Sequence, residues 1–412
     1  MRGIHFIVGF LIMLFGVSGA LADAHGDERL TLVFVGDTGT NASGAPVSSE
    51  GGYKRGRLLS VPDALEKISP WLQGDIVFAN LESVVTDRNN ITPRDKMFVF
   101  HMHPEGARDL LRAGLNAFST ANNHALDFGG IGAGETLRNM EALSQEGLLA
   151  WPGLSVDRQS GLQPQVALVR DRQIALSAWG IGGGGLPARE GRAGTLRGEE
   201  DFAALVDELG RTEADLRILS VHYGQEFVPS PTRTEIQRLR HQANVGDELS
   251  IVAGHHAHVA RGMEISNKHL TIYGLGNFLH FGTQNMARFD ICRDFGLLVK
   301  VALRNDMLGD LTVDTVEAVP LKNMHVKTEQ IMGEDASLRL QALNYLGSKL
   351  DNEGDAARGL RFAQQENGAG LWCAIGATDA RCADWVEPPL VSGRIGQQME
   401  AACSRDVRRG NI

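Results

Sequence analysis

A short apolar segment that ends in three histidines constrains the fold of this chain more than any other feature. It runs from Ile251 to His258 and reads I-V-A-G-H-H-A-H. Neutral imidazole is a common ligand of zinc, iron, copper and nickel. His256 and His258 are one residue apart, and a turn just past a strand would let both rings converge on one ion. The segment therefore predicts half of a metal site; the alternatives are a chance histidine cluster and a pH-sensitive surface patch.

Four further apolar segments of strand length also end in polar side chains that can bind metals. They are residues 30–36 before Asp37, 75–81 before Glu82, 115–120 before Asn123 and His124, and 217–221 before His222. Such runs are typical of strands buried on both faces. One polar residue after a strand often only caps a loop or a helix. Five such residues or pairs indicate a shared site, because ligands of α/β sheets lie beyond the carboxyl ends of the strands.

Helices are predicted between these strands, which makes the chain an α/β protein. The predicted helices cover about 61–72, 104–113, 129–143, 199–209 and 234–244. Residues 296–303 and 311–319 are expected to form an antiparallel pair. Residues 38–56 and the glycine run 182–185 are expected to be loops, the second of them over the site. From about residue 326 the sequence becomes helical and polar.

The composition limits the class of partner. The chain has 412 residues, of which 43% are hydrophobic and 22% charged, as is ordinary for a globular protein. Its formal net charge is −10, and it contains no run of lysine or arginine. This charge argues against nucleic acid or an anionic membrane surface as the main partner.

Residues 1–22 are typical of a signal peptide. They combine a basic start at Arg2, an apolar core over 6–17 and a small-x-small cleavage site at 20–22. The alternative is an uncleaved anchor, because the apolar stretch 4–21 is nearly long enough to span a bilayer. Either way we expect an exported protein, periplasmic or extracellular, with a membrane-anchored form as the less favoured version.

All four cysteines lie beyond the predicted signal peptide. They are Cys292, Cys373, Cys382 and Cys403, an even number that makes two disulfides plausible in an exported chain, with three pairings open. We favour Cys373 with Cys382, because the two are close in sequence and flank a loop that contains Gly376.

Six stretches give the chain a family resemblance. They are Gly36–Asp37, Asn80–Glu82, Ala121–Gly129, His222–Glu226, Gly254–His258 and Tyr273–Phe278. In this order they resemble the CapA family of capsule and poly-γ-glutamate biosynthesis proteins, which looks like part of the calcineurin-like metallophosphatase superfamily. The resemblance covers about residues 30–279. It implies a β-sandwich flanked by helices with a metal centre at one edge. We expect this domain to span 30–325, and 326–412 to form a mainly helical extension stapled by a disulfide.

The resemblance also implies roles for individual residues. One metal would bind Glu82, Asn123, His222 and His256, and a second would bind Asp37, His258 and Glu82 as a bridge. His124 would be the catalytic proton donor. The superfamily's D-x-H pattern is Asp37-Thr38-Gly39 in this chain, so a histidine ligand is missing from the second position. The expected cofactors are one or two divalent ions of manganese, iron or zinc.

Four further residues are candidates for substrate binding or for orienting the ligands: Lys96, Glu226, His255 and Asn277. For Lys96 and Glu226 a solvated surface role is the alternative. Another histidine, His280, is interpreted as structural.

The resemblance implies an exported, metal-dependent hydrolase-like protein that acts in the biosynthesis or export of an envelope polymer. The bond cleaved would be a phosphoester or an amide such as a γ-glutamyl bond. The expected partners are the anionic polymer or its precursor, with a membrane synthase or export protein as a further candidate. The alternative is a non-catalytic scaffold that binds the polymer or its synthase and keeps the metal for structure.

Overall fold

The computed structural model describes residues 29–40, 53–54, 58–180, 187–243, 246 and 248–404. The predicted signal peptide, residues 1–22, lies outside this part, as do the glycine run 182–185 and most of the predicted loop 38–56. Among the residues described, no helix is both long enough and apolar enough to cross a membrane.

The first of two large sheets carries the N-terminal strand in its interior. Its members are β1 (Leu30–Thr40), β4 (Ile76–Leu81), β7 (Ala117–Ser119), β14 (Asn277–Phe281), β15 (Gly296–Asn305), β16 (Leu311–Lys322), β17 (Glu329–Gln330), β19 (Ala363–Gln364) and β20 (Gly370–Cys373). The strand order is β19-β20-β16-β15-β1-β4-β7, with β14 paired to β1 and β17 to β16. Strands β4 and β14 both run parallel to β1, and β7 runs parallel to β4.

The second sheet contains the histidine strand. Its members are β8 (Gln165–Val169), β9 (Arg172–Gly180), β10 (Leu216–His222), β11 (Leu249–His255), β12 (Met263–Ser266), β13 (His269–Ile272) and β18 (Ala357–Gly359). The order is β18-β12-β13-β11-β10-β9-β8. Strands β9, β10, β11 and β13 are parallel to one another. Two small ribbons complete the strands, β2 (Tyr53–Lys54) with β3 (Leu58–Leu59) and β5 (Val84–Val85) with β6 (His101–Met102).

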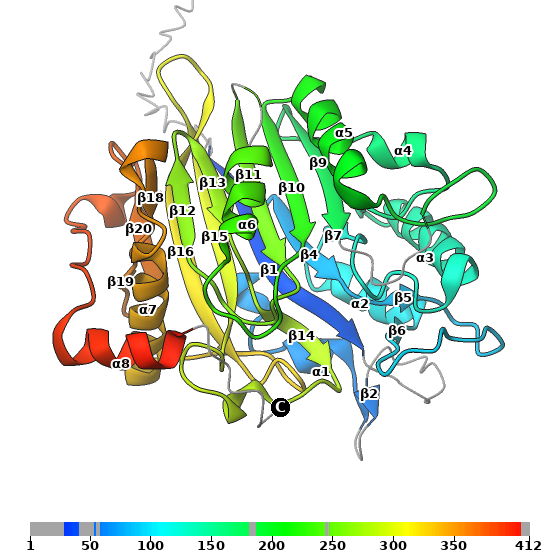
Figure 1. Cartoon of the computed structure of the whole chain (residues 1–412), viewed down its shortest axis with the longest axis horizontal. Coiled ribbons are helices and arrows are strands. Elements are labelled where there is room, and N and C mark those ends of the chain that lie inside the picture. The colour runs from blue at the N-terminus through cyan, green and yellow to red at the C-terminus, as the bar shows by residue number, and fades with distance from the viewer. Residues whose placement is uncertain are drawn as a thin grey trace, which may run out of the picture.

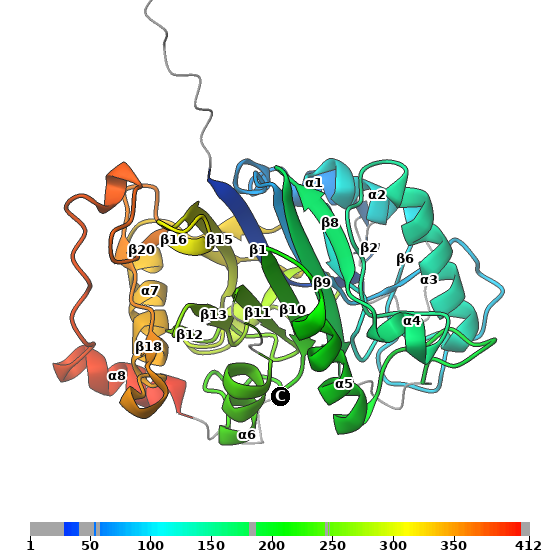
Figure 2. The same cartoon turned by 90° about the horizontal axis from the view of Figure 1, so that it is seen from above.

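Helices cover the outer faces of both sheets, except that the last two helices of the chain pack against the core between the sheets (Figure 2). They are α1 (Val61–Leu65), α2 (Pro104–Arg112), α3 (Gly129–Ser144), α4 (Arg158–Leu162), α5 (Gly198–Arg211), α6 (Arg233–Ile236), α7 (Gly333–Ser348) and α8 (Gly393–Cys403). The core between the sheets joins Phe34 and Phe78 of the first sheet to Ile218 and Ile251 of the second. A second core packs α1, α2 and α3 onto the first sheet, and a third packs α5 onto the second. The predicted α/β class, a β-sandwich flanked by helices, is confirmed.

Three predicted elements differ in detail. The helix predicted over 61–72 ends at Leu65 and resumes only as a 3₁₀ turn, Ser69–Trp71. Pro70 explains the break, because proline has no N–H for the helical hydrogen bond and its ring crowds the preceding turn. The helix predicted over 234–244 begins at Arg233 and continues from Gln237 to Gln242 as a π-helix. Residues 38–40 belong to β1 rather than to the predicted loop.

The segment after residue 325 is part of both sheets. It contains α7 and α8, as expected, but β20 also pairs with β16 and β18 pairs with β12 (Figure 1). The antiparallel pairing of β15 with β16 is confirmed, and so is the disulfide Cys373–Cys382. The second disulfide, Cys292–Cys403, ties α8 to the loop before β15.

Candidate metal centre

The parallel strands bring the predicted ligands to one end of the sandwich. Register places Asp37 of β1 beside Asn80 of β4, and His222 of β10 beside His255 of β11. Asp37, Glu82 and His222 are fully buried, and His256 is 8% exposed. Side chains that are far apart in the sequence therefore meet where the first and second sheets face each other.

The four side chains predicted for the first metal face one another around His222. Its Nε2 lies 2.9 Å from Asn123 Oδ1, 3.1 Å from His256 Nδ1 and 3.6 Å from Glu82 Oε1. On the other side of the ring, Asn80 Nδ2 lies 3.1 Å from His222 Nδ1 and donates to Asp37 Oδ1 at 2.8 Å. Asn80 thus fixes the orientation of both His222 and Asp37, a role that sequence reasoning did not assign.

The backbone of the histidine turn is strained. His256 has φ 84° and His258 has φ 57°, in the left-handed region that residues with a Cβ rarely adopt. Such conformations cost on the order of 1–3 kcal/mol each and persist where the surrounding structure enforces them. The conformation turns the imidazole of His256 toward His222 and that of His258 toward Asp37.

His258 is held by two acceptors. Its Nδ1 lies 3.0 Å from Asp37 Oδ2 and 2.9 Å from Asn277 Oδ1. Since both neighbours accept hydrogen bonds, Nδ1 carries the proton and Nε2 is the nitrogen left to face a cation. His255 is 1% exposed, and its Nδ1 lies 3.5 Å from Asp37 Oδ1. Asn277 and His255 are therefore buried against side chains that the sequence predicts as ligands.

The buried charges alter the ionisation of the group. Burial alone would raise the pKa of Asp37, but the neighbouring His255 ring and a hydrogen bond from His258 hold it well below its usual value. Burial and the charge of Asp37 raise the pKa of Glu82 to about 7. Burial, together with the charge of His258, lowers the pKa of His256 to about 4. The pKa of His222 is also lowered well below normal, mainly by burial. His222 and His256 are therefore neutral at pH 7, the form in which imidazole binds a metal.

The arrangement fits a divalent cation. Both carboxylate oxygens of Glu82 are buried, and within the described residues neither has a hydrogen-bond partner. A buried carboxylate without such partners is costly. A cation bound by Glu82 and the imidazoles around it would remove that cost. Carboxylate, amide and imidazole donors together suit manganese, iron or zinc.

His124 lies beside this group in a network of its own. Its Nδ1 is 2.6 Å from Asp127 Oδ2, and its ring stacks on Phe100 at 3.8 Å between centroids. Lys96 Nζ donates to Asp127 Oδ1 at 2.5 Å and to the carbonyl of Asn123 at 2.9 Å. Asp127 thus orients His124 and leaves Nε2 as the nitrogen able to exchange a proton. Lys96 is 24% exposed and stays a candidate for binding an anionic substrate, although Asp127 already pairs with its charge.

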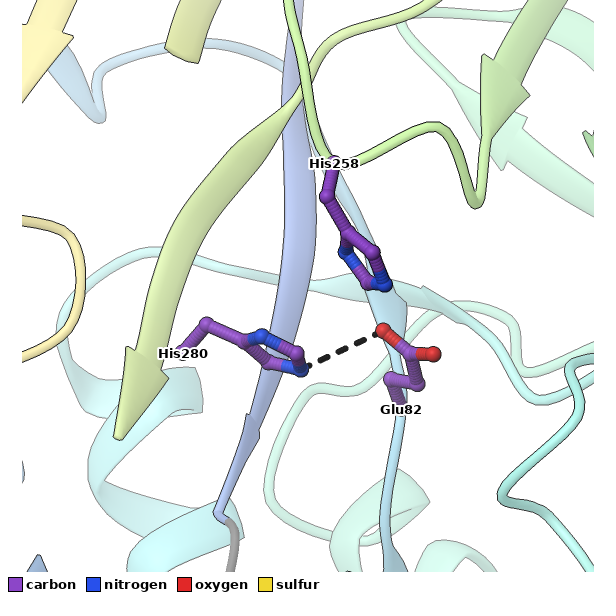
Figure 3. A group of neighbouring side chains, drawn as sticks. All are labelled: Glu82, His258 and His280. Atoms are coloured by element: carbon purple, nitrogen blue, oxygen red, sulfur yellow. Dashed lines mark ion pairs between the residues drawn. The ribbon is translucent and has the colours of Figure 1, made fainter. Parts of the chain in front are cut away.

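Two assignments change with the structure. Glu226 is exposed, and the hydrogen bonds of the His222 ring go to Asn80, Asn123 and His256, so Glu226 does not orient that ring. The interpretation of His280 as structural has to be revised. Its Nε2 lies 3.3 Å from Glu82 Oε2, and Glu82, His258 and His280 form a group that could hold a metal ion (Figure 3).

Known proteins resemble this chain over most of its length. The profile of the family described as "Bacterial capsule synthesis protein PGA_cap" matches residues 31–281. The "PGA biosynthesis protein CapA" of Bacillus subtilis (strain 168) is 26% identical over 319 residues, 75% of this chain and 78% of that protein. The "Capsule biosynthesis protein CapA" of Bacillus anthracis is 24% identical over 264 residues, 61% of this chain and 60% of that relative.

A solved structure with some similarity is a 5′-nucleotidase precursor from Thermus thermophilus. The TM-score is 0.39 and the sequence identity 12%. The match covers 74% of this chain and only 55% of that one, so this chain spans little more than half of the nucleotidase.

Proposed function

This chain belongs to the family of bacterial capsule synthesis proteins, and from that premise we propose that it is an exported, metal-dependent hydrolase. It acts in the biosynthesis or export of capsule, poly-γ-glutamate or another envelope polymer. The bond that it cleaves is a phosphoester or an amide such as a γ-glutamyl bond. Export is supported by the composition of residues 1–22 and by two disulfides, which persist mainly in oxidising compartments.

One observation carries the metal-dependent part of the proposal. Three potential ligand atoms, from Asn123, His256 and Glu82, lie within 3.6 Å of His222 Nε2 in a buried site. The carboxylate of Glu82 has no hydrogen-bond partner in the described part of the chain. A purely structural polar cluster would be expected to satisfy its buried carboxylate.

The residues around the site support hydrolysis. When bound, a divalent ion supplies Lewis acidity and lowers the pKa of water to about 7. His124 has its Nδ1 fixed by Asp127, so its Nε2 can give a proton to a leaving alkoxide or amine. Asp37 and Asn277 hold His258, and Asn80 holds His222, which keeps the donor atoms in place.

The first test is the metal content of the purified protein. Protein exposed to manganese, iron or zinc should contain one or two equivalents per chain by elemental analysis. His256→Ala and His222→Ala should lower that content. His269→Ala is a matched control. The His269 ring hydrogen-bonds Ser250, which lies at the start of β11, whereas the predicted ligands follow the end of that strand. A wild-type protein that binds none of the three metals would contradict the proposal.

A second test concerns turnover. Phosphoesters and γ-glutamyl peptides should be hydrolysed by the metal-loaded protein, and His124→Ala should lose turnover while it keeps the metal. Retained turnover in that variant would remove His124 from the mechanism.

The scaffold alternative is favoured by the histidine missing at position 39. Polymer export in cells that produce the double variant His222→Ala/His256→Ala separates the two functions. Normal export with a folded, metal-free protein would support the scaffold and exclude an essential hydrolase.

A further inference from the structure

Three side chains from separate elements converge beside the first group of ligands. Glu82 follows β4, His258 follows β11, and His280 lies on β14 (Figure 3). One ligand atom from each lies within 4.8 Å of the other two. Glu82 faces both groups, since its Oε1 is 3.6 Å from His222 and its Oε2 is 3.3 Å from His280.

His280 lacks the contacts expected of a structural histidine. It is 2% exposed, and neither ring nitrogen has a hydrogen-bond partner within the described residues. Its ring packs edge-on against Phe100 at 5.0 Å and stacks with His258 at 5.3 Å. Packing alone would be served equally by an apolar side chain, which would avoid the cost of about 1–3 kcal/mol for each unsatisfied buried polar group.

The register of two strands explains why a histidine stands at this position. Strand β14 runs parallel to β1, and His280 pairs with Gly39. Gly39 occupies the place of the histidine in the D-x-H pattern. A Cβ at Gly39 would lie 2.5 Å from the carbonyl oxygen of Glu82 and 3.1 Å from Ser83 Oγ. A side chain at position 39 would clash with the backbone of Glu82 unless that backbone moved, and the imidazole beside this position belongs to His280 on the neighbouring strand.

The hydrogen bonds of His258 allow it to bind the same cation as His280. His258 Nδ1 faces the acceptor oxygens of Asp37 and Asn277, which leaves Nε2 for a cation. Asp37 then contributes by orienting His258. Two imidazoles and one carboxylate form a donor set that favours zinc or iron.

We propose that His280 is a ligand of the second metal position and replaces the histidine that is missing at position 39. The inference rests on the proposed metal-dependent function. With it, each of the two positions has two imidazoles, and Glu82 is the carboxylate shared between them.

The test is a calorimetric titration of the metal-free, full-length protein with Zn²⁺. Wild-type protein should bind two equivalents. His280→Asn keeps most of the side-chain volume but does not reach the position of Nε2, so it should bind one. His280→Gln places an amide near Nε2 and should keep a weakened second equivalent. In His280→Asn the affinity for the second Zn²⁺ should fall by more than the roughly 10–100-fold that is typical when a residue that only orients a ligand is lost.

The matched control is His101→Asn. His101 is also buried, packs edge-on against Phe128, and has no hydrogen-bond partner for its ring nitrogens among the described residues. This variant should still bind two equivalents. Circular dichroism checks that each variant is folded. If His280→Asn does not fold, His280→Gln still tests the role of His280.

The outcomes separate this inference from the proposed function. Two equivalents of unchanged affinity in both His280 variants would overturn the role of His280 and leave the metal-dependent function standing. A wild-type protein that binds no Zn²⁺ would overturn both. Loss of the second equivalent in His280→Asn and its weaker binding in His280→Gln, with both equivalents kept in His101→Asn, would establish His280 as the ligand.

Discussion

Gly39 and His280 lie side by side on the adjacent parallel strands β1 and β14. The first position has no room for a side chain, and the second points an imidazole at Glu82. The two residues are 241 positions apart in the sequence (280 − 39) but adjacent in the sheet. A ligand missing from one strand of a sheet can therefore be supplied by its neighbour.

The first prediction concerns Gly39. Gly39→Ala should destabilise the protein by about 1–3 kcal/mol, because the new methyl group overlaps the Glu82 carbonyl oxygen and forces the backbone apart. Gly39→His should be at least as destabilising and should not restore metal binding to His280→Asn. Chemical denaturation monitored by circular dichroism gives the free energy of unfolding.

Gly134→Ala is the control for this comparison. Gly134 lies within α3, where a Cβ would meet only the end of the Arg138 side chain at 3.7 Å. Alanine is favoured over glycine inside a helix by up to about 1 kcal/mol, so this variant should be slightly more stable. Equal stability of the two alanine variants would contradict the crowding around Gly39.

Much of the site could be predicted from the sequence, because parallel strands deliver their carboxyl ends to one place. Glu82, Asn123, His222 and His256 were identifiable as polar residues at the ends of apolar runs, and the structure brings them together. His280 was not predicted as a ligand. It sits inside the run N-F-L-H-F, where a histidine looks like part of a buried strand, and the pairing with Gly39 is not visible in local sequence.

In the fold too, elements set by local sequence could be predicted, whereas short strands set by distant pairing partners could not. The strands and helices of the sandwich follow from hydrophobic patterns, and Pro70 was a readable signal for the end of α1. The short strands β18 and β20 were not predicted. They have only three and four residues and are defined by their partners β12 and β16 rather than by their own composition.

The second prediction is that cation binding releases protons. In the metal-free protein, burial would lower the pKa of His258, but its hydrogen bond to Asp37 and the charges of Glu82 and Asp37 raise it to about 10. Glu82 has its pKa raised to about 7. Both groups must be deprotonated to bind a metal. Affinity should therefore increase with pH, by about one log unit per pH unit between 7 and 9 and more steeply below 7.

Calorimetry in buffers with different enthalpies of ionisation measures this release. Zn²⁺ binding at pH 7 should release at least one proton per chain, and His258→Ala should release about one proton fewer. Affinity that does not change between pH 6 and pH 9 would show that His258 and Glu82 do not lose protons on binding.

The third prediction concerns the residue that orients His124. Asp127→Asn should lower kcat by about 10²–10⁴-fold, because the amide no longer selects the tautomer with a proton on Nδ1. The metal content should not change, since within the described contacts Asp127 bonds His124, Lys96 and the backbone of Phe100 rather than the predicted ligands. Elemental analysis and steady-state kinetics on the same preparation test both statements.

Lys96→Met separates the orientation of His124 from substrate binding. If Lys96 contacts an anionic substrate, KM should rise in this variant. If it only supports Asp127, kcat should fall while KM stays constant. A variant with both constants unchanged would assign Lys96 to neither role.

The last prediction compares the two disulfides. Cys292–Cys403 closes a separation of 111 residues, and Cys373–Cys382 a separation of 9. Loop-closure entropy gives upper values of about 4.8 kcal/mol for the first and about 2.6 kcal/mol for the second. The first also anchors the end of α8, where Arg293 donates to the carbonyls of Ala402 and Ser404.

The Cys292→Ser/Cys403→Ser variant should therefore unfold at a lower urea concentration than Cys373→Ser/Cys382→Ser. Arg293→Met, which keeps the disulfide but loses these hydrogen bonds, should fall between the wild type and the first variant. The reverse order of the two cysteine variants would mean that the long-range bond does not hold α8 to the sandwich.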